Sequence, residues 1–320
     1  MPGLTPAQLS TFNTTGYLII PDYLTPTEIS ACLTETNNLL TTFPLDTHPL
    51  TQFTTGDTSS SPTDKHVGDT YFLESGDKIR YFFEPSAICP TTSTLLKPKH
   101  LAVNKIGHSL HTLSEPFKSI TLSQRNAEIA RSLGFKDPRV LQSMVICKQP
   151  GIGGAVPPHR DSEFLYTDPP SAVGWWIALQ DAGKGNASLG MVRGSHRRRD
   201  GGVGRRFVRV YDNNEDGGEV VGTGFVENEG GRFPKGLEVD DEGGNEGEGD
   251  EVEVVDVKAG SLVLIHGNVL HKSERNTGDK SRFAYTFHVI EGAEGWEYDG
   301  RNWLQPTGDG FSRLYDDHSK

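Results

Sequence analysis

The first part of the chain has hydrophobic residues spaced as on one face of a helix. Thr5 and Thr25 each precede a proline and stand three residues before a Gln or a Glu. This is the capping-box pattern of a helix start, with proline at the first helical position. Helical spacing then continues through Ile29, Cys32, Leu33, Thr36 and Leu40. We predict N-terminal helices within residues 1–44.

Between residues 70 and 134 the pattern alternates between strand and helix. "TYFLESGDKIRYFFEP" at 70–85 indicates two strands joined by a turn at 75–77. A helical stripe of apolar residues follows over 101–113, through Val103, Ile106, Leu110 and Leu113. A further helix is expected over 123–133, ending before Gly134. We expect these helices to brace the core from outside.

Beyond Pro138 the pattern changes to short β-rich runs without helices between them. The runs are "RVLQSMVICK", "VGWWIALQD", "ASLGMV", "RFVRVY", "EVVDV", "SLVLIHG" and "RFAYTFHVI". Short strands separated by turn signals are typical of an antiparallel barrel or a jelly roll. We predict one domain over 1–320, with this β-rich part as its core.

One segment, 212–251, is strongly acidic. The chain has 31 Lys and Arg against 43 Asp and Glu, a net charge of −12. Residues 212–251 hold fourteen acidic and two basic residues, so they account for the whole excess, and they also contain eleven glycines. We predict an acidic, Gly-rich mobile insertion between strands. A calcium site is the sharper alternative, but the regular ligand spacing with a closing Glu is missing.

Composition also narrows the class of partner. The negative net charge argues against a broad phosphate-binding surface, so nucleic acid is not expected. Three cysteines without CxxC spacing suit a reducing compartment. No apolar run has the length of a secretion signal or a membrane span. We expect a cytoplasmic protein that acts on a small molecule away from membranes; the sequence carries no signal for oligomeric state.

Candidate chemistry begins with "PPHRDSEF". His159 and Asp161 stand two positions apart, and on a β-strand this spacing puts both side chains on one face. The pair is weak by itself because such spacing is common by chance. A third ligand from His266 or His271 would give two histidines and one carboxylate, the facial arrangement that oxygen-activating ferrous iron uses. Arg282 would suit the far carboxylate of a metal-chelating 2-oxo acid.

These residues resemble the pattern of the Fe(II)/2-oxoglutarate-dependent phytanoyl-CoA dioxygenase family. That pattern is H-x-D, a distal His, and an Arg eleven residues after it, which His159, Asp161, His271 and Arg282 match. Further similarity to one subgroup of the family runs from about residue 70 to 307. It lies in "SGDKIRYFFE", "NKIGH", "QSMVICKQP", "FLYT", "LVLIHG", "HKS", "AYTFH" and "NWLQPT".

The resemblance implies a catalytic metal site of His159, Asp161 and His271. It also implies 2-oxoglutarate contacts from Lys105, Met144, Trp176, Ser273 and Arg282. The implied cofactor is Fe(II), and the cosubstrates are 2-oxoglutarate and O₂. The fold class we predict is mainly β (α+β), with a double-stranded β-helix (jelly-roll or cupin-like) core braced by helices.

The implied reaction is oxidation of a C–H bond of a small organic substrate, with release of succinate and CO₂ and with hydroxylation as the default outcome. Two alternatives stay open. One is a zinc-dependent hydrolase on the same three ligands, in which Arg282, Ser273 and Trp176 lack a joint purpose. The other is a non-catalytic protein that binds 2-oxoglutarate.

Several other residues have a structural interpretation. Trp175 and Trp176 are adjacent, so one is expected in the core and the other on the opposite face. His108 and His111 have helical spacing but no third metal ligand, so packing is favoured. His288 shares a strand face with Arg282, so we predict that it lines the substrate side of the barrel.

Overall fold

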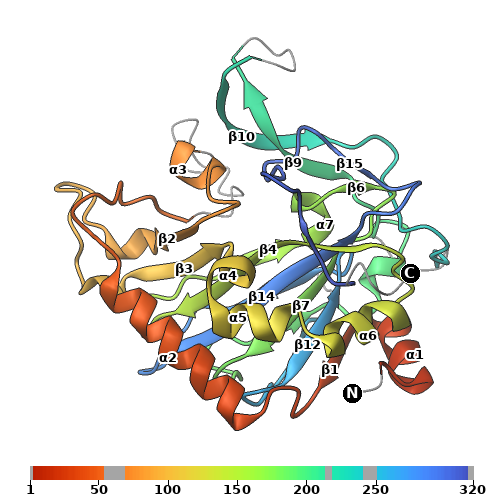
Figure 1. The fold of residues 1–320 in the computed structure, drawn as a ribbon, viewed down its shortest axis with the longest axis horizontal. Coiled ribbons are helices and arrows are strands. Elements are labelled where there is room, and N and C mark those ends of the chain that lie inside the picture. Colours follow the sequence, from red (N-terminus) through yellow and green to blue (C-terminus); the bar gives the residue numbers. More distant parts are fainter. Residues whose placement is uncertain (1–2, 54–68, 213–217, 241–250, 316–320) are drawn as a thin grey trace.

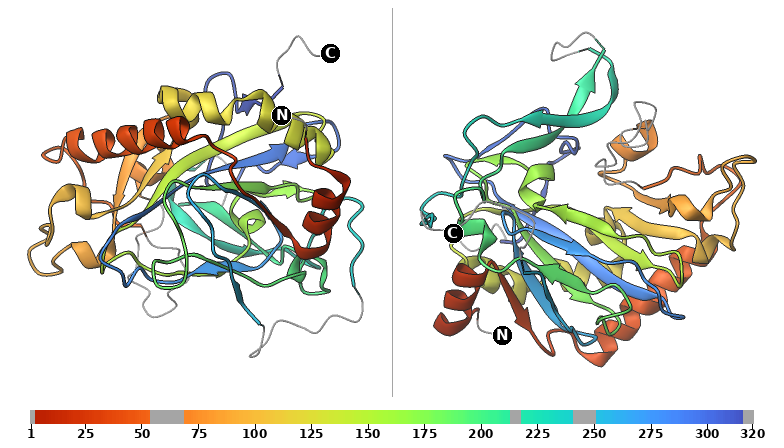
Figure 2. Two further views of the ribbon diagram at one scale, coloured as in Figure 1. Left: turned by 90° about the horizontal axis from the view of Figure 1, so that it is seen from below. Right: turned by 180° about the vertical axis from the view of Figure 1, so that it is seen from behind.

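The computed structural model describes residues 3–53, 69–212, 218–240 and 251–315. Helices cover one side of a large antiparallel sheet, and a smaller sheet lies on the other side (Figures 1 and 2). The α-helices are α1 (Pro6–Thr15), α2 (Pro26–Thr42), α3 (Thr70–Leu73), α4 (Leu110–Leu113), α5 (Glu115–Thr121), α6 (Gln124–Ser132) and α7 (Asp161–Phe164). Three short 3-10 helices are η1 (Pro85–Ala87), η2 (Lys99–Leu101) and η3 (Ser195–Arg197).

Most of the strands lie from Pro138 onward, as predicted. The first eight are β1 (Tyr17–Ile20), β2 (Ile79–Phe83), β3 (Val103–His108), β4 (Pro138–Lys148), β5 (Val156–His159), β6 (Thr167–Asp168), β7 (Val173–Ala178) and β8 (Leu189–Met191). The others are β9 (Arg205–Tyr211), β10 (Val220–Glu227), β11 (Glu253–Val254), β12 (Leu262–His266), β13 (His271–Ser273), β14 (Arg282–Glu291), β15 (Glu297–Tyr298) and β16 (Ser312–Arg313).

Two sheets enclose the interior of the fold. The larger has eight strands in the order β1-β12-β7-β14-β4-β3-β2, with β16 pairing with β4, and the smaller has the order β11-β8-β13-β5. Apolar side chains of β7, β12 and β14 form one buried cluster with those of β8. The two sheets therefore face each other, as a jelly roll requires.

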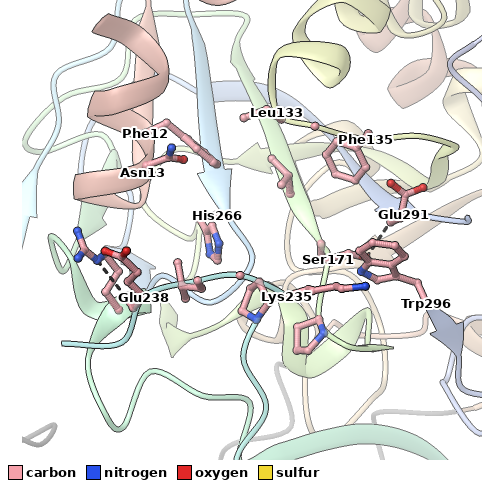
Figure 3. Close-up of a pocket in the computed structure, with 18 residues that line it drawn as sticks. Phe12, Asn13, Leu133, Phe135, Ser171, Lys235, Glu238, His266, Glu291 and Trp296 are labelled. Atoms are coloured by element: carbon pink, nitrogen blue, oxygen red, sulfur yellow. Dashed lines mark hydrogen bonds between the residues drawn. The ribbon is translucent and has the colours of Figure 1, made fainter. Parts of the chain in front are cut away.

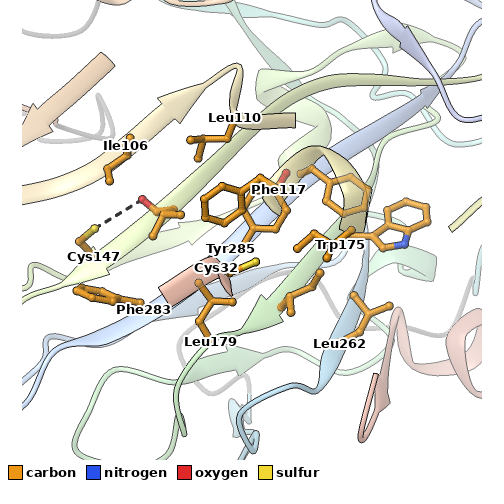
Figure 4. Close-up of a cluster of buried hydrophobic side chains, with 14 of the residues drawn as sticks. Cys32, Ile106, Leu110, Phe117, Cys147, Trp175, Leu179, Leu262, Phe283 and Tyr285 are labelled. Atoms are coloured by element: carbon orange, nitrogen blue, oxygen red, sulfur yellow. Dashed lines mark hydrogen bonds between the residues drawn. The ribbon is translucent and has the colours of Figure 1, made fainter. Parts of the chain in front are cut away.

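The outer face of the larger sheet is closed by helices. Phe117 of α5 packs against Tyr285 of β14 with ring centroids 4.6 Å apart, and Trp175 of β7 stacks on Phe287. Cys32 of α2 lies in the same cluster, fully buried and unpaired (Figure 4). The prediction that helices over 101–113 and 123–133 brace the core from outside is confirmed for the second of them, α6. Helices α2 and α5 cover the same face of the sheet.

Both N-terminal helices begin where the sequence predicts. The hydroxyl groups of Thr5 and Thr25 accept hydrogen bonds from the backbone N–H of Gln8 and Glu28, completing two capping boxes. Helix α6 ends before Gly134, which has a φ of 89°. The strand β1 between α1 and α2 was not predicted; it pairs with β12 at an edge of the larger sheet.

The predicted helix over 101–113 is wrong for most of its length. Val103–His108 forms β3, which pairs with β2 and β4, and only Leu110–Leu113 is helical. Val103, Ile106 and Leu110 are fully buried. A strand covered on both faces can carry apolar residues at any position, so the apparent helical stripe did not report the backbone conformation.

The first strand predicted within 70–85 is also wrong. Thr70–Leu73 forms the short helix α3, because the carboxylate of Asp69 caps it by accepting a hydrogen bond from the backbone N–H of Phe72. The second strand is present as β2, and its partner is β3.

The acidic segment is more ordered than expected. Val220–Glu227 forms β10, which pairs with β9 in a hairpin that projects at the top of Figure 1. Phe225 packs against Phe207 and Phe164, with ring centroids 5.2 and 5.5 Å away. Strand β9 supplies both backbone partners and an aromatic surface, which the composition of the segment alone does not reveal. The predictions for 213–217 and 241–250 lie outside the described residues.

The strands of the larger sheet come from widely separated parts of the chain, from β1 near the start to β16 near the end. One domain over 1–320 stays a prediction. Each helix in the described part of the chain is too short or too polar to cross a bilayer.

Candidate metal centre

Three side chains from separate elements meet between the two sheets. His159 ends β5, Asp161 begins α7, and His271 begins β13. Their ligand atoms all lie within 4.8 Å of one another. The backbone register explains the meeting of the histidines, because His159 and His271 are directly paired across β5 and β13.

The H-x-D pair does not lie within one strand. We expected His159 and Asp161 on one face of a single strand. Asp161 is instead the first residue of α7, beyond the end of β5. The turn from strand to helix, not strand alternation, brings the carboxylate toward the imidazole.

Both histidines present a lone pair to a common point. The Nδ1–H of His159 donates to the carbonyl of Pro157 at 2.9 Å, and that of His271 donates to the carbonyl of Val269 at 3.1 Å. In each ring Nε2 is then the unprotonated nitrogen. The two Nε2 atoms lie 3.6 and 3.7 Å from Oδ1 of Asp161. This donor set fits a divalent transition metal such as Fe(II).

The protonation states also suit a metal. Burial and the neighbouring His271 lower the pKa of His159 to about 4. Burial by itself would raise the pKa of Asp161, but His288, His271 and His159 hold it well below its usual range. A neutral imidazole and an ionised carboxylate are the forms that bind metals.

A pocket of about 180 Å³ opens beside these three residues. All five residues predicted to contact the cosubstrate line it: Lys105, Met144, Trp176, Ser273 and Arg282. Trp176 faces this pocket while Trp175 lies in the core on the other face of the sheet, as predicted. His288 lines the same pocket, and the prediction that this is the substrate side of the barrel stays a prediction.

Arg282 is a fully buried cation in the pocket. It is 1% exposed, and its Nη2 donates to the carbonyl of Ala187. Its Nη1 is buried and has no hydrogen-bond partner in the described part of the chain. Burial lowers its pKa to about 10, so it keeps its charge at neutral pH. A buried, unsatisfied guanidinium nitrogen fits the carboxylate of a bound diacid.

Lys105 has a different setting from the one expected. It lies on β3 and not on a helix, and it is 4% exposed. Its Nζ stands 3.4 Å from the ring centroid of Phe53, in a cation–π contact. Burial lowers the pKa of Lys105 well below its usual value.

Sequence reasoning missed part of the pocket wall. Phe207 and Trp303 line the pocket and are almost fully buried. No alternation in "RFVRVY" marks Phe207 as inward-facing, because Arg206 and Arg209 fall on opposite faces of the strand. Trp303 lies outside regular strands, so no periodicity indicated it.

The other histidines considered as metal ligands lie outside the cluster of His159, Asp161 and His271. His266 lines a separate cavity of about 560 Å³ (Figure 3). The centroid of its ring is 4.6 Å from that of His196. Because Ile265 faces the metal centre and strand residues alternate, His266 faces away from it. His108 and His111 are both buried packing residues, on β3 and α4.

Comparisons with known proteins agree with this geometry. The model of the family described as Phytanoyl-CoA dioxygenase (PhyH) matches residues 12–284. Phytanoyl-CoA dioxygenase domain-containing protein 1 of Bos taurus is 41% identical over 311 residues, covering 96% of this chain and 97% of that protein. Phytanoyl-CoA dioxygenase of Arabidopsis thaliana is 38% identical over 302 residues, covering 94% of each. The predicted resemblance, including its subgroup of domain-containing protein 1 type, is confirmed.

Solved structures agree on the fold. The non-heme alpha ketoglutarate dependent epimerase SnoN from nogalamycin biosynthesis superposes with a TM-score of 0.58 at 15% identity, covering 97% of this chain and 98% of that one. At this identity the similarity shows the fold alone. It confirms the predicted double-stranded β-helix core braced by helices.

Proposed function

The chain belongs to the phytanoyl-CoA dioxygenase family, and from this premise we propose that it oxidises a C–H bond of a small organic molecule. Hydroxylation is the default outcome, with release of succinate and CO₂. The chain is an Fe(II)/2-oxoglutarate-dependent dioxygenase, with Fe(II) as cofactor and 2-oxoglutarate and O₂ as cosubstrates. SnoN, which shares the fold, has been solved in complex with Fe3+ and alpha ketoglutarate.

In this proposal His159, Asp161 and His271 hold the iron. Iron with 2-oxoglutarate supplies the chemistry that splits O₂, converts the oxo acid to succinate and CO₂, and oxidises the substrate. The carbonyl groups of Pro157 and Val269 keep both imidazole rings oriented for this task. Three protein ligands leave the remaining coordination positions for reactants.

The cosubstrate residues each have a physical task. The free Nη1 of Arg282 donates to the distal carboxylate of 2-oxoglutarate, and Ser273 adds a hydroxyl donor. Lys105 contributes a second positive charge when a carboxylate is near it. Met144 and Trp176 form apolar walls that exclude water from the reacting groups.

The rest of the pocket indicates what kind of substrate enters. Its wall carries the aromatic rings of Phe53, Phe72, Phe164, Phe207 and Trp303. Such a surface binds hydrocarbon or a flat ring rather than a strongly hydrated group. We therefore propose that the part of the substrate that is oxidised is apolar.

One observation carries the proposal: the His159, Asp161 and His271 cluster shares an apolar pocket with a buried guanidinium that has a free donor. A hydrolase or a simple binding protein needs only part of this set. No observation favours the zinc hydrolase over the dioxygenase.

The test is a 2-oxoglutarate turnover assay with the purified chain and Fe(II). We expect succinate release that rises when metabolite fractions containing the substrate are added. Asp161→Ala should lower this rate by more than about a hundredfold, since changes outside the ligand set already cost 10–100-fold. A parent protein with tight stoichiometric zinc and no succinate, or an Asp161→Ala variant with the parent rate, would refute the proposal.

A further inference from the structure

The two oxygens of the Asp161 carboxylate have different surroundings. Oδ1 lies 3.6 Å from Nε2 of His159 and 3.7 Å from Nε2 of His271. Oδ2 points away from both and lies 3.3 Å from Nε2 of His288, within hydrogen-bond distance. The carboxylate therefore has one oxygen directed to the metal position and one directed to the larger sheet.

Nε2 of His288 carries the ring proton, because the carboxylate oxygen that it meets can only accept a hydrogen bond. A second, longer contact agrees with this tautomer. The side-chain amide of Gln142 lies with Nε2 3.5 Å from Nδ1 of His288, so that the amide donates and the ring nitrogen accepts. With Nδ1 as acceptor, the proton of the neutral ring is on Nε2. The ring can then donate this proton to Oδ2 of Asp161.

Strand register places the whole arrangement. His288 of β14 is directly paired with Gln142 of β4 and with Gly174 of β7. A Cβ atom at Gly174 would stand 3.1 Å from Oδ2 of Asp161 and 3.5 Å from Cδ2 of His288. The glycine thus leaves the space in which the carboxylate reaches the histidine.

We propose that His288 is a positioning residue that holds Oδ2 of Asp161, so that the carboxylate offers Oδ1 alone to Fe(II). This inference rests on the proposed function. A one-oxygen carboxylate leaves an additional coordination position that a two-oxygen carboxylate would fill. That position is needed when a chelating oxo acid and O₂ must both bind.

The geometry separates this role from that of a fourth metal ligand. Among the described residues, the group whose ligand atoms lie within 4.8 Å of one another contains His159, Asp161 and His271 but not His288. His288 is 8% exposed and contacts the carboxylate, so it acts through Asp161.

The experiment is an anaerobic titration of the metal-free protein with Fe(II) in the presence of 2-oxoglutarate, followed by the visible charge-transfer absorption of the chelate. His288→Leu removes the donor at similar size. We expect its apparent Kd for Fe(II) to rise about 10–100-fold, as for other changes around metal ligands, with an altered absorption band. His288→Gln, which keeps an N–H donor, should restore most of the affinity.

His111→Gln is the matched control, because it replaces another buried histidine on the outer face of the same sheet. It should bind Fe(II) as the parent does. A His288→Leu variant with the affinity and band of the parent would overturn the inference. If that variant does not fold, Gln142→Leu takes its place: a several-fold loss of affinity supports the inference, and parental binding overturns it. A parent protein that binds no Fe(II) would instead refute the proposed function.

Discussion

Arg282 illustrates what a single buried residue contributes. Its side chain lies 5.4 Å from the ring centroid of Trp176, and one nitrogen is bound to the carbonyl of Ala187. Nε donates to the carbonyl of Asn186 at 3.5 Å, and Nη1 has no protein partner in the described residues. Leaving a buried donor unsatisfied costs free energy, so a ligand that supplies an acceptor gains affinity.

We predict that Arg282→Lys raises the KM for 2-oxoglutarate by about 10–100-fold, because a lysine ammonium cannot hold the Ala187 carbonyl and also present a donor where Nη1 stands. Steady-state succinate release at varied 2-oxoglutarate measures this change. Arg131→Lys, in a surface ion pair with Glu128, is the control and should leave the KM unchanged. An unaltered KM in Arg282→Lys would show that Arg282 does not bind the oxo acid.

At the scale of elements, the outer helices depend on buried polar contacts as well as apolar packing. His111 of α4 is 3% exposed, and its Nδ1 lies 2.8 Å from Oγ of Ser143 on β4. Burial lowers the pKa of His111 to about 4. The folded chain therefore holds this histidine neutral between α4 and the sheet.

This burial predicts a pH-dependent stability. Below the ordinary pKa of 6.5 the unfolded chain binds a proton at His111. The folded chain binds that proton only below about pH 4. Stability from this residue is thus complete above about pH 6.5 and falls by about 1.4 kcal/mol per pH unit below it. Urea unfolding of the metal-free protein at pH 7.5 and 5 measures it.

His111→Gln should lose less stability than the parent over that range, by about 2 kcal/mol, because glutamine does not titrate. Comparison with this variant is needed, since other buried histidines titrate in the same direction; His196, for example, has its pKa lowered to about 4 by burial. Equal losses in both proteins would mean that His111 takes up its proton in the folded state.

At the scale of the whole molecule, the proposed metal links distant parts of the chain. His159 and Asp161 follow β5, while His271 comes from β13 after the hairpin of β9 and β10. A metal that binds all three favours the folded state over the unfolded chain.

We predict that Mn(II), a redox-stable substitute for Fe(II), stabilises the parent by about 2.7 kcal/mol at a hundred times its Kd. Thermal unfolding with Mn(II) and then with a chelator measures the increment. Asp161→Ala should lose most of it, and His111→Gln should retain it. Equal stabilisation of the Asp161→Ala variant would place the metal elsewhere.

The sequence by itself determined the class of fold and the helix starts at Thr5 and Thr25, because capping boxes and turn residues are local patterns. For the metal cluster, local spacing offered the H-x-D pair and left His266 and His271 as alternatives; the family resemblance implied His271. The apolar pattern predicted a helix where β3 lies, and it did not predict β10. The reason is that the apolar periodicity of a strand depends on which of its faces other elements cover.

Tertiary structure alone decided how the metal cluster is built. It put Asp161 on a helix start, Lys105 on a strand, and His288 against Asp161. The contact of His288 with Asp161 depends on the register of β14 with β4 and β7 and on the space at Gly174. Register is fixed by packing between segments far apart in the chain, so no local pattern encodes it.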